Sequence, residues 1–162
     1  INIASRCSGF IKKRFAGQLA TSLDDADLYQ QFVSQKPAIT SAFEQREYAS
    51  AMRQIMQLAD LANQYINDKQ PWVIAKQDGQ DELLHKVCTQ GINLFRFLLV
   101  MLKPVLPAMS EQAETFLNES PLNWDSADQP LLNHTIKPFK PLMTRIDEQQ
   151  TAALLDDANQ GA

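Results

Sequence analysis

The sequence predicts an all-α fold, an antiparallel bundle of about six helices with a C-terminal return segment. Apolar residues recur three and four positions apart along most of the chain, as they do on amphipathic helices. Only 5 glycines are present, and no stretch rich in Val, Ile and Thr alternates with period two, so a sheet has little support. The 162 residues, 44% hydrophobic and 21% charged, suit one globular domain with a core of its own.

The first helix is predicted by apolar residues that share one side, and its end is predicted by a glycine. Ile3, Phe10 and Ile11 lie roughly on that side, Phe15 continues the apolar run, and Gly17 is a stop signal.

The second helix is predicted to begin at the pair Asp24 and Asp25, because acidic residues suit a helix start. Leu28 and Phe32 give it an apolar face, and we expect it to end before Pro37.

A long helix is predicted over residues 39–66, followed by a break at Asn67 and Asp68. Its apolar stripe consists of Met52, Ile55, Met56, Ala59, Ala62 and Ile66. Pro71 suits the first turn of the next, shorter element.

The most hydrophobic helix is predicted over residues 81–102, between Gly79 and Pro104. Apolar side chains cover much of its circumference, which places it at the centre of the bundle. Ser110 is expected to cap a further short helix, with Glu111 and Glu114 near its positive end.

The organisation changes after Asn118. Residues 1–120 are predicted to form the bundle, and residues 121–162 an extended tail with a final helix over about 147–158 that packs back. The irregular part of this tail is marked by Pro121, Trp124, Pro130, Pro138 and Pro141.

Charge, cysteine usage and hydropathy limit the class of protein. The net charge is −4 and the pI is near 5.1, so any nucleic-acid site must be local and must depend on contacts to bases. Cys7 and Cys88 have no ligand-spaced partner and are interpreted as two reduced, packed thiols. No signal peptide or membrane-spanning segment is evident, which predicts a cytosolic protein without a membrane partner. Since the chain starts without methionine and apparently within a helix, we expect it to be part of a longer protein.

The sequence contains no convincing catalytic centre. Glu82 and His85 have the Glu-x-x-His spacing of carboxylate-bridged metal sites, but such a site needs a second copy. The only other histidine, His134, lies in the proline-rich stretch, so His85 is interpreted as a surface residue.

Asn2, Arg6 and Trp72 could together read an unpaired base. Asn2 and Arg6 are four residues apart and project from one helix face, and both side-chain types suit bidentate contacts to base edges. Trp72 follows Pro71 at a helix start, where its ring can protrude and stack. The ordinary alternative makes Trp72 a core residue, Asn2 a helix cap and Arg6 a surface charge, and spacing alone favours that alternative.

A dense basic cluster follows on the same helix, formed by Lys12, Lys13 and Arg14. Such clusters usually form a solvated helix face. If the chain binds RNA, these residues are the best local source of phosphate attraction in an acidic protein.

A series of ordered segments resembles the anticodon-binding domain of bacterial-type methionyl-tRNA synthetases. The segments are residues 2–6, 9–15, 59–65, 70–76, 92–96, 102–107, 130–132 and 145–147, so the resemblance covers essentially the whole chain. Each one is weak alone, and the proline motif of residues 102–107 is shared with sibling class I synthetases. The combination of Asn2, Arg6 and the pair Pro71 and Trp72 is specific to the methionine branch, and it reverses the preference for the ordinary alternative.

The resemblance implies a role in tRNA recognition. In that family, the residues matching Asn2 and Arg6 hydrogen-bond anticodon bases, and the residue matching Trp72 stacks on the first anticodon base, a cytosine. The implied partners are the tRNA for methionine and the chain's own catalytic domain, which residues 121–162 are expected to face. The parent enzyme attaches methionine to its tRNA with ATP and Mg²⁺, and some members hold Zn²⁺.

Family features that this sequence lacks imply a fragment without chemistry. The two nucleotide-binding signatures and the zinc knuckle are missing, so we expect the fragment to bind neither ATP, methionine nor zinc and to be inactive alone. No oligonucleotide-binding extension follows, so we expect a monomer. Two alternatives remain open: a helical protein-interaction module, marked by a wide apolar groove, and the equivalent domain of a sibling class I synthetase.

Overall fold

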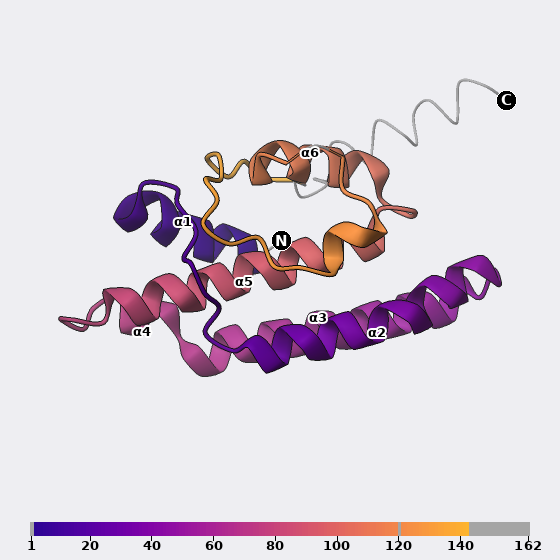
Figure 1. Ribbon diagram of the computed structural model, residues 1–162, viewed down its shortest axis with the longest axis horizontal. Helices are drawn as coiled ribbons and strands as arrows, with labels where there is room; N and C mark the ends of the chain where they lie inside the picture. Colours follow the sequence, from indigo (N-terminus) through magenta and orange to yellow (C-terminus); the bar gives the residue numbers. More distant parts are fainter. Residues whose placement is uncertain (1, 120, 143–162) are drawn as a thin grey trace, which may run out of the picture.

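The computed structural model describes residues 2–119 and 121–142 (Figure 1). Within these residues the chain forms six α-helices, one 3-10 helix and no named strand, which confirms the all-α prediction. The elements are α1 (Asn2–Phe15), α2 (Ala26–Glu44), α3 (Tyr48–Lys69), α4 (Pro71–Ile74), α5 (Asp81–Leu102), α6 (Pro107–Leu117) and η1 (Trp124–Ala127).

Helix α5 is the centre of the fold. It contacts α1, α2, α3, α4, α6 and η1, and Figure 1 shows it between the α2–α3 pair and the layer that contains α6. Its side chains are buried without a break from Val87 to Met101. Both its bounds and its central position confirm the prediction, since a helix that is apolar over much of its circumference is stable only when other elements cover it.

The boundary between α2 and α3 differs from the prediction. Helix α2 continues through Pro37 to Glu44, so the helix end predicted before Pro37 was wrong. Pro37 is exposed, whereas Phe32 and Ile39 are fully buried on the same helix, so packing outweighs the lost hydrogen bond. The real break is a left-handed turn at Arg46, which has φ 63°.

Two further local predictions were wrong. Helix α3 passes through Asn67 and Asp68 and ends at Lys69, because the left-handed residue is Gln70. Ser110 does not cap α6, because this helix begins at Pro107. The hydroxyl of Ser110 is buried and donates to the carbonyl of Leu106 at 3.1 Å.

The predicted beginning of α2 is confirmed, since the Asp25 carboxylate accepts from the amide of Leu28 at 2.8 Å.

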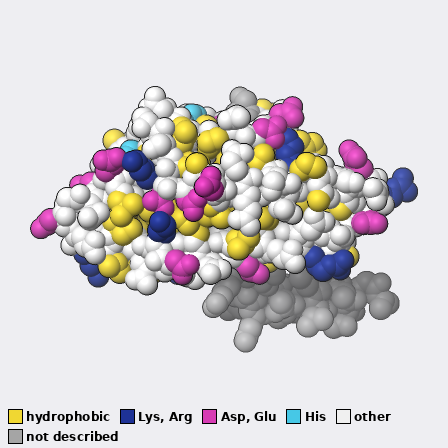
Figure 2. Space-filling view, turned by 60° about the horizontal axis from the view of Figure 1, so that its bottom comes forward, with side chains coloured by type: hydrophobic (Ala, Val, Ile, Leu, Met, Phe, Trp, Pro, Cys, Tyr) yellow, Lys and Arg dark blue, Asp and Glu magenta, His cyan; other side chains and the backbone are white. Residues whose placement is uncertain are grey.

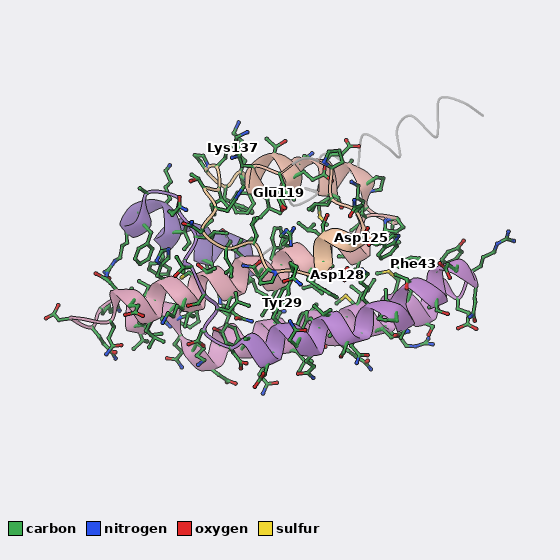
Figure 3. All side chains as sticks on the ribbon, in the orientation of Figure 1. Tyr29, Phe43, Glu119, Asp125, Asp128 and Lys137 are labelled. Carbon is green, nitrogen blue, oxygen red and sulfur yellow. The ribbon has the colours of Figure 1, made fainter. Side chains whose placement is uncertain are left out.

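Polar side chains on α5 attach the return segment, residues 121–142, to the bundle. The side-chain NH₂ of Asn93 donates to the carbonyl of Leu131 at 3.0 Å, and the side-chain oxygen of Asn93 accepts from the backbone N–H of Leu131 at 2.5 Å. Arg96 forms a bidentate ion pair with Glu119 at 2.6 and 2.8 Å and donates to the carbonyl of Gln129 (Figure 3). The predicted helix over 147–158 and the predicted interface at residues 145–147 lie outside the described residues.

A second group of contacts fixes η1 against α2. The hydroxyl of Tyr29 donates to the carbonyl of Ala127 at 3.0 Å, and Lys36 pairs with Asp128 at 2.6 Å (Figure 3). Burial raises the pKa of Tyr29 to about 12, although Arg96 acts in the opposite direction. The return segment is therefore attached to the helices along much of its described length.

Cys7 and Cys88 are both free thiols in the core, between α1 and α5. A hydrogen bond with Cys7 and burial raise the pKa of the Cys88 thiol. Among the described residues, no helix has the length and apolarity needed to cross a membrane.

Candidate nucleic-acid interface

Helix α1 presents one exposed polar face and packs its other face on α5. Asn2, Arg6 and Lys13 are exposed, and their spacing places them with Gly9 on one side of the helix. The buried side consists of Ile3, Ala4, Cys7, Ser8 and Ile11. The contacts of this buried side with α5 fix the direction in which the polar face points.

Trp72 is placed by the turn between α3 and α4. Gln70 adopts a left-handed conformation, Pro71 occupies the first turn of α4 and is buried, and Trp72 comes next. The indole is 36% exposed, so it is held by its neighbours without being a core residue. The interpretation of Trp72 as a packed core residue is therefore excluded by its position.

Arg6 lies over the ring of Trp72. The central carbon of the guanidinium is 5.2 Å from the ring centroid, which is cation–π geometry. At exposed sites this contact contributes about 0.5–1 kcal/mol, enough to favour one arrangement of both side chains. Two residues that are distant in the sequence thus form one surface, and both have chemistry suited to bases.

A cleft of about 470 Å³ opens beside this pair. It is lined by Arg6, Gly9, Phe10, Lys13 and Trp72. The structure thus joins three of the predicted site residues, Arg6, Lys13 and Trp72, in a single concavity. Asn2 does not line the cleft; it is exposed one helical turn before Arg6 on the same face.

The charge of the cleft is positive and uncompensated. None of the ion pairs among residues 2–119 and 121–142 includes Arg6 or Lys13. Elsewhere the charges are mixed: Figure 2 shows basic and acidic side chains interspersed over the face that it presents. A protein of net charge −4 thus presents two basic side chains, Arg6 and Lys13, in one cleft.

The structure divides the basic cluster on α1. Lys13 lines the cleft, whereas Lys12 lines a separate cavity of about 250 Å³ beside Lys137. Arg14 pairs with Asp81 at 2.6 Å and donates to the carbonyl of Ala75. Arg14 thus connects α1 to the beginning of α5, and only Lys13 of the three lies beside Arg6 and Trp72.

Glu82 and His85, the pair with the spacing of metal ligands, each make other contacts in the structure. Glu82 pairs with Lys86 at 2.6 Å, and this hydrogen bond lowers the pKa of Glu82. His85 is half-buried, stacks on Phe15 with ring centroids 3.9 Å apart, and bonds to the carbonyl of Gln18, so it lies at the surface but also packs against the end of α1 and the chain that follows it. Within the part of the chain that the structure describes, no group of three potential ligands gathers.

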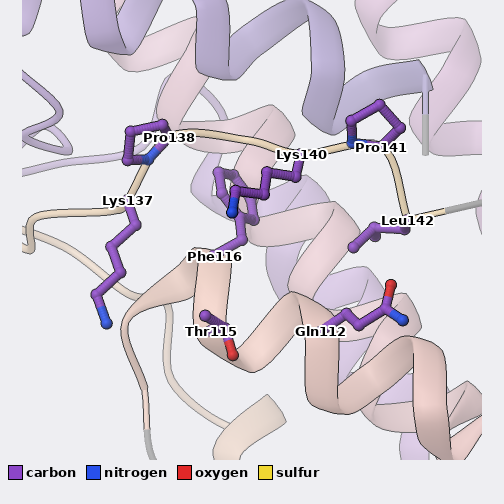
Figure 4. A pocket seen from close by; sticks show the side chains of 8 residues that line it. All are labelled: Gln112, Thr115, Phe116, Lys137, Pro138, Lys140, Pro141 and Leu142. Atoms are coloured by element: carbon purple, nitrogen blue, oxygen red, sulfur yellow. The ribbon is translucent and has the colours of Figure 1, made fainter.

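Another cavity, of about 500 Å³, lies between α6 and residues 137–142 (Figure 4). Phe116, Pro138, Pro141 and Leu142 give it a largely apolar wall. The cavity contains none of the residues predicted to contact a base.

Comparison with known proteins identifies the family. Residues 16–154 match the model of a family described as the anticodon binding domain of methionyl tRNA ligase. The chain belongs to this family. The match includes Trp72, Lys76 and the return segment, but begins after Asn2, Arg6 and Lys13. Because the description names the methionine enzyme, it favours this branch over a sibling class I synthetase.

Solved structures confirm the fold of this anticodon-binding domain. The chain matches the apo form of Mycobacterium tuberculosis methionyl-tRNA synthetase with a TM-score of 0.79 at 17% identity, over 90% of this chain and 31% of that one. It also matches the enzyme of that organism in complex with methionyl-adenylate, with a TM-score of 0.74 at 18% identity, over 89% and 30%. The chain therefore spans under a third of the length of these relatives.

Sequence reasoning did not identify two residues of the cleft, Gly9 and Phe10, as site residues. Both lie within one turn of Arg6, at i+3 and i+4, so helical spacing could have placed them beside it. The apolar pattern of the sequence places Phe10 only on the apolar side of the first helix.

Proposed function

We propose that this domain recognises the anticodon loop of the tRNA for methionine through the cleft between α1 and Trp72. Trp72 stacks on the first anticodon base, Arg6 and Asn2 hydrogen-bond base edges, and Lys13 attracts the RNA backbone. The observation that supports this most strongly is the position of Arg6, 5.2 Å from the Trp72 ring and without a carboxylate partner among the described residues.

The chemistry of the cleft suits an unpaired base. Stacking of a base on an aromatic side chain contributes about 1–3 kcal/mol, and Trp72 is 36% exposed at the edge of the cleft. Arg is a planar fork that forms paired hydrogen bonds to base edges or phosphate, and Lys is a point charge that suits phosphate. Single-stranded loops are the usual RNA targets of such aromatic and polar combinations.

In the longer protein, we propose that the domain selects the tRNA for a catalytic domain that attaches methionine to it with ATP. We propose that the domain has no ATP, methionine or zinc site of its own. It acts as one copy, joined to its catalytic domain. Because aminoacylation supplies translation, the proposed location is the cytoplasm.

The test is a titration of the domain with two RNA stem-loops at fixed low salt. One carries the methionine anticodon, and the other differs only at the first anticodon base. We expect the cytosine loop to bind about 5- to 100-fold more tightly, as loss of one stacked or bidentate contact implies. Equal affinity for the two loops would contradict the proposal.

A further inference from the structure

Gly9 lies in the interior of α1, where glycine is unfavourable. It follows Arg6 by three residues and precedes Lys13 by four, within the helix that spans Asn2–Phe15. Glycine inside a helix lowers stability relative to alanine, because its backbone loses more freedom on folding. A physical reason for a glycine at this position must therefore come from conformation, from packing or from a ligand.

Neither its backbone conformation nor packing against the described residues explains Gly9. The glycines with positive φ are Gly17 and Gly79, so Gly9 has a backbone that any residue can adopt. A Cβ built on Gly9 meets no atom within 4 Å. Nothing within the described chain therefore requires position 9 to lack a side chain.

Gly91, the other glycine within a helix of the described residues, shows what a packing requirement looks like. A Cβ there would lie 2.6 Å from the sulfur of Cys7, 3.0 Å from Cδ1 of Ile66 and 3.3 Å from Cγ2 of Ile3. Gly91 thus permits α1 and α3 to approach α5 closely. The contrast separates a glycine that the fold needs from one that it does not.

Gly9 instead lines the cleft beside Arg6, Lys13 and Trp72. We propose that Gly9 is a binding-site residue: it leaves room for a nucleotide of the RNA loop to pack directly against the backbone of α1, opposite the Trp72 ring. A Cβ at position 9 would enter this cleft and narrow the space between the helix and the indole. The inference rests on the proposed function, since it assigns a further residue to the same site.

Binding and stability should therefore respond in opposite directions to Gly9→Ala. Alanine is the better helix former and meets no neighbour, so we expect Tm to rise by about 1–4 °C. The added methyl group crowds the nucleotide, so we expect the cytosine-first stem-loop to bind at least about fivefold more weakly. A merely structural role would not separate the two readouts.

A second variant makes the test independent of how far the cleft can adjust. Gly9→Leu places a larger side chain in the cleft and should weaken binding more than Gly9→Ala does. Gln57→Leu, at an exposed position in α3, is the matched control for an added apolar side chain and should leave binding unchanged.

The wild-type titration separates this inference from the function on which it rests. If the wild-type domain does not distinguish the two loops, the proposed function fails. If the wild-type domain distinguishes them and both Gly9 variants bind like the wild type, the role of Gly9 is wrong and the function stands. A fall of Tm in Gly9→Ala would also overturn the inference, because the fold would then require the glycine.

Discussion

The guanidinium of Arg6 on α1 lies over the indole of Trp72 on α4, with 5.2 Å between the central guanidinium carbon and the ring centroid. Arg6 is directed by the packing of α1 on α5, and Trp72 by the left-handed turn at Gln70. The pair therefore depends on the whole bundle, and its two members can be changed separately.

Arg6→Lys keeps the charge and removes the planar fork. We expect affinity for the cytosine-first stem-loop to fall about tenfold, because an ammonium group cannot make the paired hydrogen bonds of a guanidinium. The free energy of unfolding, measured in urea, should change by less than about 0.5 kcal/mol, because Arg6 is exposed. Retention of full affinity in a filter-binding titration would show that Arg6 acts only through its charge.

Trp72→Ala removes the stacking surface. We expect preference for the first anticodon base to disappear and affinity to fall by about 1–3 kcal/mol. The thermal melt should shift less than on truncation of a fully buried aromatic residue, because Trp72 is 36% exposed. A large loss of thermal stability in this variant would instead make Trp72 a structural residue.

Lys13 and Arg14 are neighbours with opposite expected roles. Lys13→Ala should weaken binding to all loops alike and reduce the salt dependence of binding, as loss of one phosphate contact does. Arg14→Ala should lower the free energy of unfolding by about 1 kcal/mol, because it removes the contacts to Asp81 and the Ala75 carbonyl. Binding isotherms at several salt concentrations, paired with urea melts, distinguish the two; similar behaviour of both variants would contradict this division.

Much of this fold follows from the sequence because α5 dominates it. A helix that is apolar over much of its circumference belongs at the centre of a bundle, so its bounds and position were predictable. The beginning of α2 was predictable too, since Asp25 is a favoured cap.

The boundary between α2 and α3 was not predictable from local signals. The Glu47 N–H bonds to the carbonyl of Ala42, and the Arg46 N–H to that of Phe43, which is the Schellman arrangement that ends helices. Its left-handed position is usually glycine, and here it is Arg46, while the proline at position 37 indicated a break that packing overrides.

The candidate site was only partly predictable for a related reason. Helical spacing brings Asn2 and Arg6 together without a structure, but nothing local relates Arg6 to Trp72. That relation depends on how α1 and α4 pack on α5. The same packing determines that Lys12, Lys13 and Arg14 lie in three different surroundings.

Asn93 is expected to hold the return segment in place. Asn93→Ala removes two hydrogen bonds to Leu131 at a fully buried position and should lower the free energy of unfolding by about 2–4 kcal/mol. Limited proteolysis should then cut residues 121–142 faster. Asn63→Ala, exposed on α3, is the control; cleavage of Asn93→Ala at the rate of this control would contradict the role.

Stability should decline at alkaline pH. An unfolded tyrosine loses its proton near pH 10, but burial raises the pKa of Tyr29 to about 12 and also raises the pKa of Tyr65. Between these values the unfolded state binds fewer protons, so the stability present below pH 10 is lost as pH rises towards 12. Since one pKa unit corresponds to about 1.4 kcal/mol, urea melts over this range should show a loss of a few kcal/mol. Tyr29→Phe should make the decline shallower, and an unchanged slope would contradict this cause.

The most direct test of anticodon recognition observes Trp72 itself. The protein has 2 tryptophans, and Trp124 packs beside Phe43 with ring centroids 6.0 Å apart, so Trp124→Phe leaves Trp72 as the sole indole reporter. The measurement is a fluorescence titration of this variant with the methionine anticodon stem-loop and with the loop changed at the first anticodon base. We expect saturable quenching by the cytosine loop at a concentration at least about fivefold below that needed for the changed loop. Binding of the cytosine loop without a change in Trp72 fluorescence, or identical quenching curves for the two loops, would contradict it.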